Sequence, residues 1–265
     1  MTECFSFSRG EVPLLISIPH DGRELAPGMA ERMTENGRAL PDTDWHVRRL
    51  YEFANALGAG IIAANFSRYV VDLNRASSDD ALYPGQLSTG LCPTRTFAGA
   101  EIYQDGEHVA VDEQAVRIRN YWHPYHAKIE TELSEIKQRF GYALLWDAHS
   151  IRTRVPGLFD GDLPELNIGT SDGGSCNASL ESAVAAKATE SPFSRVLNGR
   201  FKGGHITRHF GRPQANTHAI QLELAQHCYM DEASGDYDPE AAEALIDTVR
   251  SMLVALLEVA DRNLG

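Results

Sequence analysis

The chain is poor in basic side chains and in long apolar runs, and each shortage excludes a class of protein. Twenty-four Lys and Arg stand against 37 Asp and Glu in 265 residues, a formal net charge of −13. Nucleic acid is not expected as a partner, because phosphate binding needs clustered basic residues. No apolar stretch approaches the ~20 residues that span a bilayer, so no membrane association is expected. The N-terminus also lacks the basic start and apolar run of a signal peptide.

Cysteine is scarce as well: the four thiols are far apart and form no CxxC pair. Scattered cysteines of this kind favour a reducing compartment and argue against a disulfide framework or a structural zinc site. We therefore expect a cytoplasmic protein, a monomer or a small homo-oligomer. An apolar fraction of 43% is enough for a continuous core, and the length fits one domain over residues 1–265.

Short apolar runs alternate with segments of helical periodicity along the chain. This alternation predicts an α/β fold with a mixed, mostly parallel central sheet flanked by helices. Residues 76–106 are rich in Ser, Pro, Gly and Thr, which predicts a functional loop. Strands are expected at residues 12–19, 61–65, 69–73, 142–146 and 218–224, and helices at 42–57, 112–140 (broken or kinked at Pro124), 178–189 and 238–263.

Three polar side chains stand at or near the ends of predicted strands. His20 follows VPLLISIP, His149 follows YALLWDA, and Glu223 lies within AIQLEL. Ligands of open α/β sheets bind outside the carboxyl ends of the strands, and histidine is a common metal ligand. A single histidine after a strand is more often a hydrogen-bonded loop residue. Two such histidines, each near a carboxylate, predict a metal site. A catalytic zinc there would need a third protein ligand and a water.

The third ligand has two candidates. Glu24 comes four residues after His20, and Asp44 lies at the start of the helix expected from residue 42. A carboxylate in a first helical turn often serves the helix cap, but Asp42 competes for that role. The spacing alone leaves both candidates open.

A carboxylate-binding pair is predicted at Asn74 and Arg75, which end the segment RYVVDLNR. An amide beside a guanidinium suits bidentate recognition of a carboxylate, although an ordinary surface ion pair would look the same. Arg208 is a second candidate, because nearby glycines in GGHITRHFGRP allow close approach to a ligand. Glu223 is the expected general base, since burial in an apolar strand would raise its pKa; an outward-facing Glu is the alternative.

The segments that carry these residues resemble the N-formylglutamate amidohydrolase (N-formylglutamate deformylase) family. The similarity extends in order over most of the chain. The matching segments are PLLISIPHDG, LPDTDWHVRRLY, SRYVVDLNRASSDDALYPGQLSTGLCPT, YWHPYH, LLWDAHSIRTRVPGLFDG, LNIGTSDGGSC, and GGHITRHFGRP with HAIQLELAQHCYMDE.

The resemblance implies a fold like that of the zinc carboxypeptidases and aspartoacylases, and hydrolysis of N-formyl-L-glutamate in histidine degradation. It implies one divalent ion, zinc as the expected metal, on His20, His149 and a carboxylate. The carboxypeptidase pattern has Glu three residues after its first His, where this chain has Arg23, so Asp44 of PDTDW is preferred to Glu24. Glu223 matches the base, Asn74 and Arg75 the clamp, and the second carboxylate of the substrate calls for Arg208 or Arg68.

Two other functions remain open from the sequence. One is a metal-dependent deacylase that acts on another N-acyl amino acid. The other is a non-catalytic homologue that only binds an acidic ligand, in which Glu223 would be dispensable.

Overall fold

One mixed β-sheet organises the chain, whose computed structural model describes residues 3–79 and 89–265. The strand order is β1-β3-β2-β4-β7-β5-β6. The four central strands β3, β2, β4 and β7 are parallel. Strand β1 pairs antiparallel with β3, β5 pairs antiparallel with β7, and β6 is parallel to β5. The strands are β1 Phe5–Ser8, β2 Leu14–Ile18, β3 Gly60–Ala64, β4 Ala143–Ile151, β5 Leu166–Gly169, β6 Arg195–Leu197 and β7 Thr217–Ala225.

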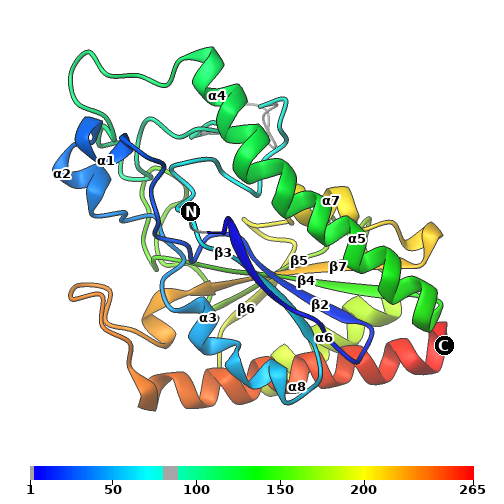
Figure 1. Cartoon of the computed structure of the whole chain (residues 1–265). Coiled ribbons are helices and arrows are strands. Elements are labelled where there is room, and N and C mark those ends of the chain that lie inside the picture. The colour runs from blue at the N-terminus through cyan, green and yellow to red at the C-terminus, as the bar shows by residue number, and fades with distance from the viewer. Residues whose placement is uncertain (1–2, 80–88) are drawn as a thin grey trace.

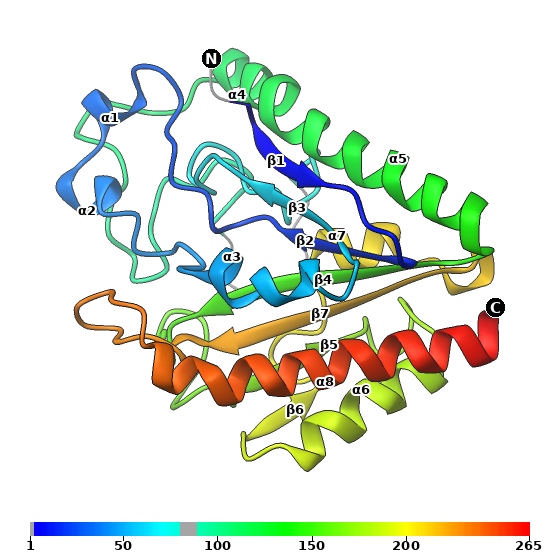
Figure 2. The ribbon, with the colours of Figure 1, turned by 60° about the horizontal axis from the view of Figure 1, so that its bottom comes forward.

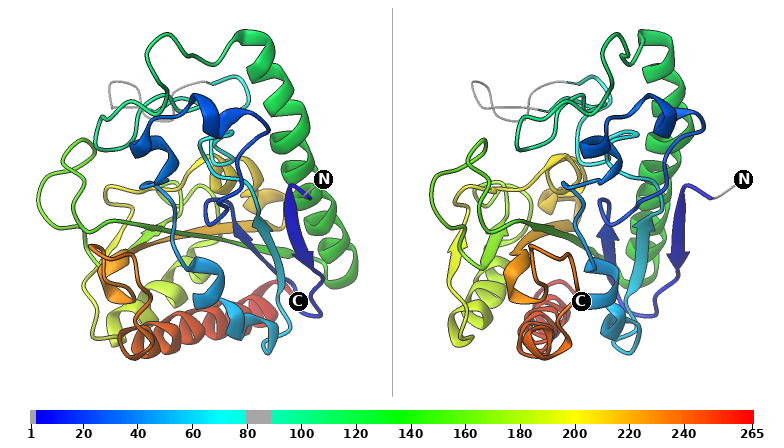
Figure 3. Two further views of the ribbon diagram at one scale, coloured as in Figure 1. Left: turned by 60° about the vertical axis from the view of Figure 1, so that its left-hand side comes forward. Right: turned by 90° about the vertical axis from the view of Figure 1, so that its left-hand side faces the viewer.

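Helices cover both faces of this sheet (Figure 1). When the molecule is turned, α5 lies on one side of the strands and α6 and α8 lie on the other (Figures 2 and 3). Loops and short helices gather at the ends toward which the β4 and β7 arrows point in Figure 2. The helices are α1 Met29–Arg32, α2 Glu35–Arg38, α3 Val47–Leu50, α4 Val111–Arg117, α5 His123–Phe140, α6 Ala178–Glu190, α7 His205–Phe210 and α8 Pro239–Leu264, with 3₁₀ turns η1 Glu52–Asn55, η3 Pro213–Ala215 and η4 Gln226–Cys228 and a π-helical turn η2 Ile118–Trp122.

The two faces of the central strands carry different side chains. In β7, Ile220, Leu222 and Leu224 belong to the core under α6 and α8, whereas Ala219 packs in the core under α5. Strand residues alternate between faces, so Gln221 and Glu223 lie on the α5 side with Ala219. The α/β class, the mixed sheet and its two helical layers are thereby confirmed.

The helix expected at residues 42–57 is wrong in extent. Only α3 and the 3₁₀ turn η1 form there, because residues 40 and 46 have left-handed backbones, with φ of 49° and 64°. Asp42 caps no helix: its Oδ2 accepts hydrogen bonds from the Tyr69 hydroxyl at 2.6 Å and from Phe97 N at 2.9 Å. Tertiary contacts hold this segment in a non-helical conformation and leave Asp44 outside any helix.

The strand expected at residues 69–73 does not form. Its carbonyl groups are used elsewhere: Arg117 Nη1 donates to Tyr69 O and Val70 O at 3.2 and 3.1 Å. The strands β1, β5 and β6 were not predicted. Pro124 does not end the helix at 112–140, because the π-helical turn η2 comes just before it and the chain continues helical into α5.

The remaining elements agree with expectation, except that β4 continues five residues beyond the predicted strand 142–146, so that His149 lies within it. Helix α8 begins after Asp238, whose side chain accepts from Glu240 N and Ala241 N. The loop expected at residues 76–106 has no helix or strand in its described part; residues 80–88, with the LYPGQ motif, lie outside the described residues. Among the described helices, none is long and apolar enough to cross a membrane.

Candidate active site

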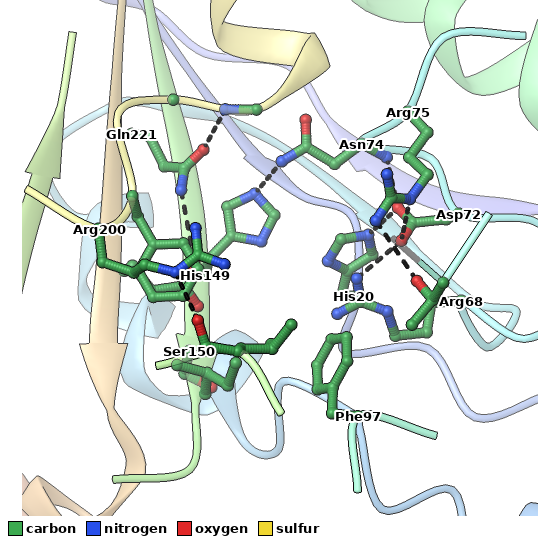
Figure 4. A pocket seen from close by; sticks show the side chains of 17 residues that line it. His20, Arg68, Asp72, Asn74, Arg75, Phe97, His149, Ser150, Arg200 and Gln221 are labelled. Atoms are coloured by element: carbon green, nitrogen blue, oxygen red, sulfur yellow. Dashed lines mark hydrogen bonds and ion pairs between the residues drawn. The ribbon is translucent and has the colours of Figure 1, made fainter. Parts of the chain in front are cut away.

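A pocket lies at the carboxyl end of the parallel strands. The register of β4 against β7 places His149 directly across from Glu223, and His20 comes two residues after β2 ends. Figure 4 shows His20, Asp72, Arg68 and Arg75 on one side of this pocket and His149, Gln221 and Arg200 on the other. The sequence therefore anticipated its position, since ligand sites of α/β sheets form at this edge.

His20, Asp44 and His149 come together as a buried group with metal-ligand chemistry. One donor atom from each lies within 4.8 Å of the others. Asp44 Oδ2 is 3.0 Å from His149 Nδ1 and 3.7 Å from His20 Nδ1. His20 Nδ1 is buried and has no hydrogen-bond partner among the residues that the structure describes. Ligands of a tetrahedral zinc with bonds of ~2.0–2.3 Å are ~3.3–3.8 Å apart. The separation of 3.7 Å falls in this range and that of 3.0 Å is shorter, so the group could hold a divalent ion once Asp44 and His149 move slightly apart.

Polar side chains contact the second ring nitrogen, Nε2, of each histidine on the side away from the three-residue group. His20 Nε2 is 2.8 Å from Asp72 Oδ1. His149 Nε2 is 3.2 Å from Asp147 Oδ1 and 2.9 Å from Asn74 Nδ2. Carboxylates of this kind fix the orientation of metal-binding histidines. Sequence reasoning missed Asp72, although it stands two residues before Asn74 in DLNR.

The charges in this group are strongly coupled. Burial favours neutral Asp44, but His20 and His149 outweigh that effect and hold the pKa of Asp44 well below its usual range. Burial also opposes protonation of His149, yet Asp147 and Asp44 raise its pKa well above the ordinary value. Asp44 Oδ2 further accepts from Ser150 N at 3.1 Å. Glu24, the competing candidate ligand, is exposed and lies outside the group.

Glu223 faces the pocket and is 7% exposed. Burial raises its pKa to about 8, with His149 opposing the rise. Gln221 Nε2 donates to Glu223 Oε2 at 3.3 Å, and Gln221 Oε1 accepts from Gly204 N at 2.7 Å. Gln221 was missed, although a strand places residues two apart on one face. A carboxyl group with a pKa near neutrality can both accept and return a proton.

Three arginines line the pocket: Arg68, Arg75 and Arg200. Arg68 Nη2 bonds Asp72 Oδ2 at 2.7 Å. Arg75 Nε lies 3.7 Å from Asp72 Oδ2 and has no hydrogen-bond partner in the described part of the chain. Arg200 Nε donates to Leu158 O at 2.8 Å. Arg208 is absent from the lining, and its Nε donates to Gly203 O at 2.8 Å.

Asn74 also lines the pocket, but its amide is engaged. Its Oδ1 accepts from Ile206 N at 2.8 Å, which directs Nδ2 toward His149. Gly204 makes this possible, because a Cβ there would lie 2.2 Å from Asn74 Nδ2. The arrangement as a whole offers a candidate cation site, a carboxyl base and three guanidinium groups around one small-molecule pocket.

Comparisons with known proteins agree with this chemistry. A family model described as N-formylglutamate amidohydrolase matches residues 12–230. Relatives named N-formylglutamate deformylase from Pseudomonas aeruginosa and Pseudomonas putida are 52% and 46% identical, each over 97% of both chains. A solved N-formylglutamate amidohydrolase from Ralstonia eutropha JMP134 has a TM-score of 0.81 at 25% identity over 98% of both chains. A gene product of Agrobacterium tumefaciens, 15% identical over 96% of both chains, shares the fold at a TM-score of 0.71.

Proposed function

The chain belongs to the N-formylglutamate amidohydrolase family, and from this premise we infer that it hydrolyses N-formyl-L-glutamate to formate and L-glutamate. We assign the whole of residues 1–265 to one amidohydrolase domain acting in the cytoplasm, as the last step of histidine degradation. The observation that carries the proposal is the buried His20–Asp44–His149 group beside Glu223 in a pocket lined by arginines.

His20, Asp44 and His149 would hold one divalent ion, and zinc suits two imidazoles and a carboxylate. Such an ion supplies Lewis acidity, which lowers the pKa of the attacking water toward ~7 and polarises the formyl carbonyl. With an ion held by the two Nδ1 atoms, each histidine would carry its proton on Nε2. Asp72, 2.8 Å from His20 Nε2, and Asp147, 3.2 Å from His149 Nε2, would accept these protons.

Glu223 is the proposed general base. It accepts a proton from the attacking water and then returns it to the amine of the departing glutamate. Its position across from His149 puts the carboxylate next to the candidate cation site. Gln221 holds Glu223 Oε2 by a hydrogen bond, which limits the directions in which the carboxylate can turn.

The arginines would bind the two carboxylates of the substrate from opposite sides of the pocket (Figure 4). We assign the α-carboxylate to Arg75 with Asn74, and the side-chain carboxylate to Arg200. Arg68 supports Asp72 while it lines the same pocket. Arg200 is preferred to Arg208 because it belongs to the lining. A His149 bound to a cation through Nδ1 carries its proton on Nε2 and donates it to Asp147, which leaves the Asn74 amide available for substrate.

The test of the base is Glu223→Gln. We expect kcat for formate release to fall by ~10²–10⁴-fold, the usual contribution of a general base, while metal analysis finds the bound ion retained. Glu132→Gln is the matched control: Glu132 is also a buried glutamate, but it pairs with Lys128 on α5, away from the pocket. Unchanged turnover in Glu223→Gln would leave only ligand binding as the function.

The test of the substrate class compares four acyl amino acids at equal metal loading. N-formylglutamate should exceed N-formylaspartate, N-acetylaspartate and N-formylglutamine in kcat/KM. Arg200→Ala should lower kcat/KM for N-formylglutamate and leave that for N-formylglutamine nearly unchanged, because the latter lacks the side-chain carboxylate. Arg75→Ala should lower both. A preference for an acetylated substrate would instead favour the alternative function, a metal-dependent deacylase of another N-acyl amino acid.

A further inference from the structure

A second group of side chains with metal-ligand chemistry lies beyond the end of β7. It consists of Glu165, His227 and Cys228, with one donor atom of each within 4.8 Å of the others. Glu165 immediately precedes β5, and His227 and Cys228 end the 3₁₀ turn η4. None of the three lines the pocket that holds His20 and Glu223. The hydrolysis proposed above makes no use of them.

Hydrogen bonds fix which nitrogen of His227 carries the proton. Thr153 Oγ1 lies 2.6 Å from Glu232 Oε1, and a carboxylate can only accept, so the hydroxyl donates its one proton there. Thr153 Oγ1 also lies 2.7 Å from His227 Nδ1 and must accept from it. In the neutral ring this leaves the lone pair on Nε2, which faces Glu165 and Cys228.

That lone pair faces two candidate ligand atoms, and without a cation it accepts a hydrogen bond from the Cys228 thiol. His227 Nε2 is 3.4 Å from Glu165 Oε1 and 3.8 Å from Cys228 Sγ. Both distances fall within the ~3.3–3.8 Å that separate two ligands of a tetrahedral zinc with bonds of ~2.0–2.3 Å. Glu165 is held in place from behind, because its Oε2 accepts from Ser194 N and from the Ser194 hydroxyl. A cation bound between the three atoms would replace the thiol proton that Cys228 shares with His227.

The surroundings favour a cation and give it access to solvent. His227 and Glu165 line an open pocket together with Asp162, Asp231 and Glu232. Arg154 also lines it, but its guanidinium pairs with Asp162. The side chain of His227 is 45% exposed, so an ion can reach Nε2 from outside. Three protein ligands leave a fourth position for water on the pocket side.

We propose that Glu165, His227 and Cys228 form a second site for a borderline-soft divalent cation of the zinc class. Thiolate, imidazole and carboxylate together suit Zn²⁺ or Co²⁺ and not Mg²⁺ or Ca²⁺, which prefer oxygen ligands alone. Binding breaks the Cys228 S–H bond, forms a sulfur–metal bond and releases one proton to solvent.

Cobalt distinguishes this site from the first one. The group His20, Asp44 and His149 contains no sulfur, so only the second site can give the near-ultraviolet thiolate-to-Co²⁺ charge-transfer band. The metal-free full-length protein is titrated with Co²⁺ while absorption and bound metal are recorded. We expect this band, with up to two ions bound per chain. Absence of the band at saturating Co²⁺ in the wild-type protein would overturn the proposal.

Variants assign the band to its ligands. Cys228→Ser should abolish it and remove one bound Co²⁺ per chain, and His227→Gln should weaken Co²⁺ binding at this site at least tenfold. Cys176→Ser is the matched control, a second buried free thiol, and should keep the band. Persistence of the band in Cys228→Ser would contradict the assignment. The measurement involves no turnover, so its result is independent of the proposed hydrolysis.

Discussion

At the scale of single residues, the groups behind the two histidines decide how the site can work. Asp72 contacts three partners at once: His20 Nε2, the backbone N of Asn74 and Arg68 Nη2. Arg68 and His20 hold the pKa of Asp72 well below its usual range, against the effect of its burial. Asp72 is therefore a fixed negative charge that orients His20 and anchors the segment carrying Asn74 and Arg75.

Asp72→Asn should weaken metal binding without preventing it. The amide oxygen can still accept from His20 Nε2, but the charge that favours the bound imidazole is lost. We expect a 10–100-fold rise in the metal Kd, the usual effect of losing such a partner. Competition with a chromophoric chelator measures it. Asp247→Asn, on the exposed face of α8, should leave the metal Kd unchanged; an unchanged Kd in Asp72→Asn would remove Asp72 from this role.

Gly204→Ala should damage the site through Asn74. The backbone of Gly204 is extended, with φ of −82° and ψ of −163°, so alanine is allowed there. Its Cβ would nevertheless lie 2.2–2.5 Å from the amide atoms of Asn74. Asn74 must move, and we expect kcat/KM to fall at least tenfold.

A double-mutant cycle tests this cause. In an Asn74→Ala background the clashing amide is gone, so adding Gly204→Ala should lower kcat/KM little further. The expected coupling between the two changes is ~0.5–3 kcal/mol, typical of residues in contact. Additive effects would show that Gly204 acts through something other than Asn74.

At the scale of elements, α5 covers the sheet with a buried histidine. His126 Nε2 donates to Leu73 O at 2.8 Å, and its ring stacks on Trp122 with centroids 3.7 Å apart. His205 faces the same ring at 5.5 Å and Phe210 at 5.8 Å. Burial lowers the pKa of His126 to about 3, and the hydrogen bond to Leu73 only partly offsets that effect.

The protein should therefore lose stability through His126 as the pH falls. The pKa of His126 in the folded chain is below the ~6.5 of an unfolded one, so its contribution is complete above pH ~6.5 and is lost toward pH ~3. Between pH 7 and pH 5 the loss is on the order of 2 kcal/mol. Urea unfolding at both pH values measures it in the wild type and in His126→Gln. The variant should show a shallower pH dependence, and parallel profiles would contradict the prediction.

At the scale of the whole molecule, the charge of −13 contrasts with a pocket lined by three arginines. The net charge therefore does not favour an anionic substrate, and in the proposed reaction the local guanidinium groups would bind it. The same site buries Asp44, Asp72, Asp147 and Glu223 close together, a cost that a bound cation would reduce.

Removal of the metal should accordingly lower the stability of the whole fold. An ion present at about 1,000 times its Kd stabilises the folded state by about 4 kcal/mol, on the order of 10 °C in Tm. Chelator should lower the Tm of the wild type, and added Zn²⁺ should restore it. Asp44→Asn should have a Tm that changes much less with chelator. An equal response in both proteins would place the stabilising ion elsewhere.

The sequence alone determined the local part of this description. Apolar runs of strand length placed β2, β4 and β7, and the polar residues at their ends placed His20, His149 and Glu223 at one edge. Helix α8 was also predictable, because its amphipathic periodicity and its Asp238 cap are local signals.

Tertiary structure decided what local patterns cannot carry. It brought Asp44, and not Glu24, beside His20 and His149 by folding residues 41–46 into an irregular segment, which contacts with Tyr69 and Phe97 hold in place. It brought Arg200, and not Arg208, into the pocket, and it placed Asp72 behind His20. It also kept residues 69–73 out of the sheet, where Arg117 bonds the carbonyl groups of Tyr69 and Val70 and His126 bonds that of Leu73. Each outcome depends on contacts between residues far apart in the chain, for which spacing in the sequence contains no signal.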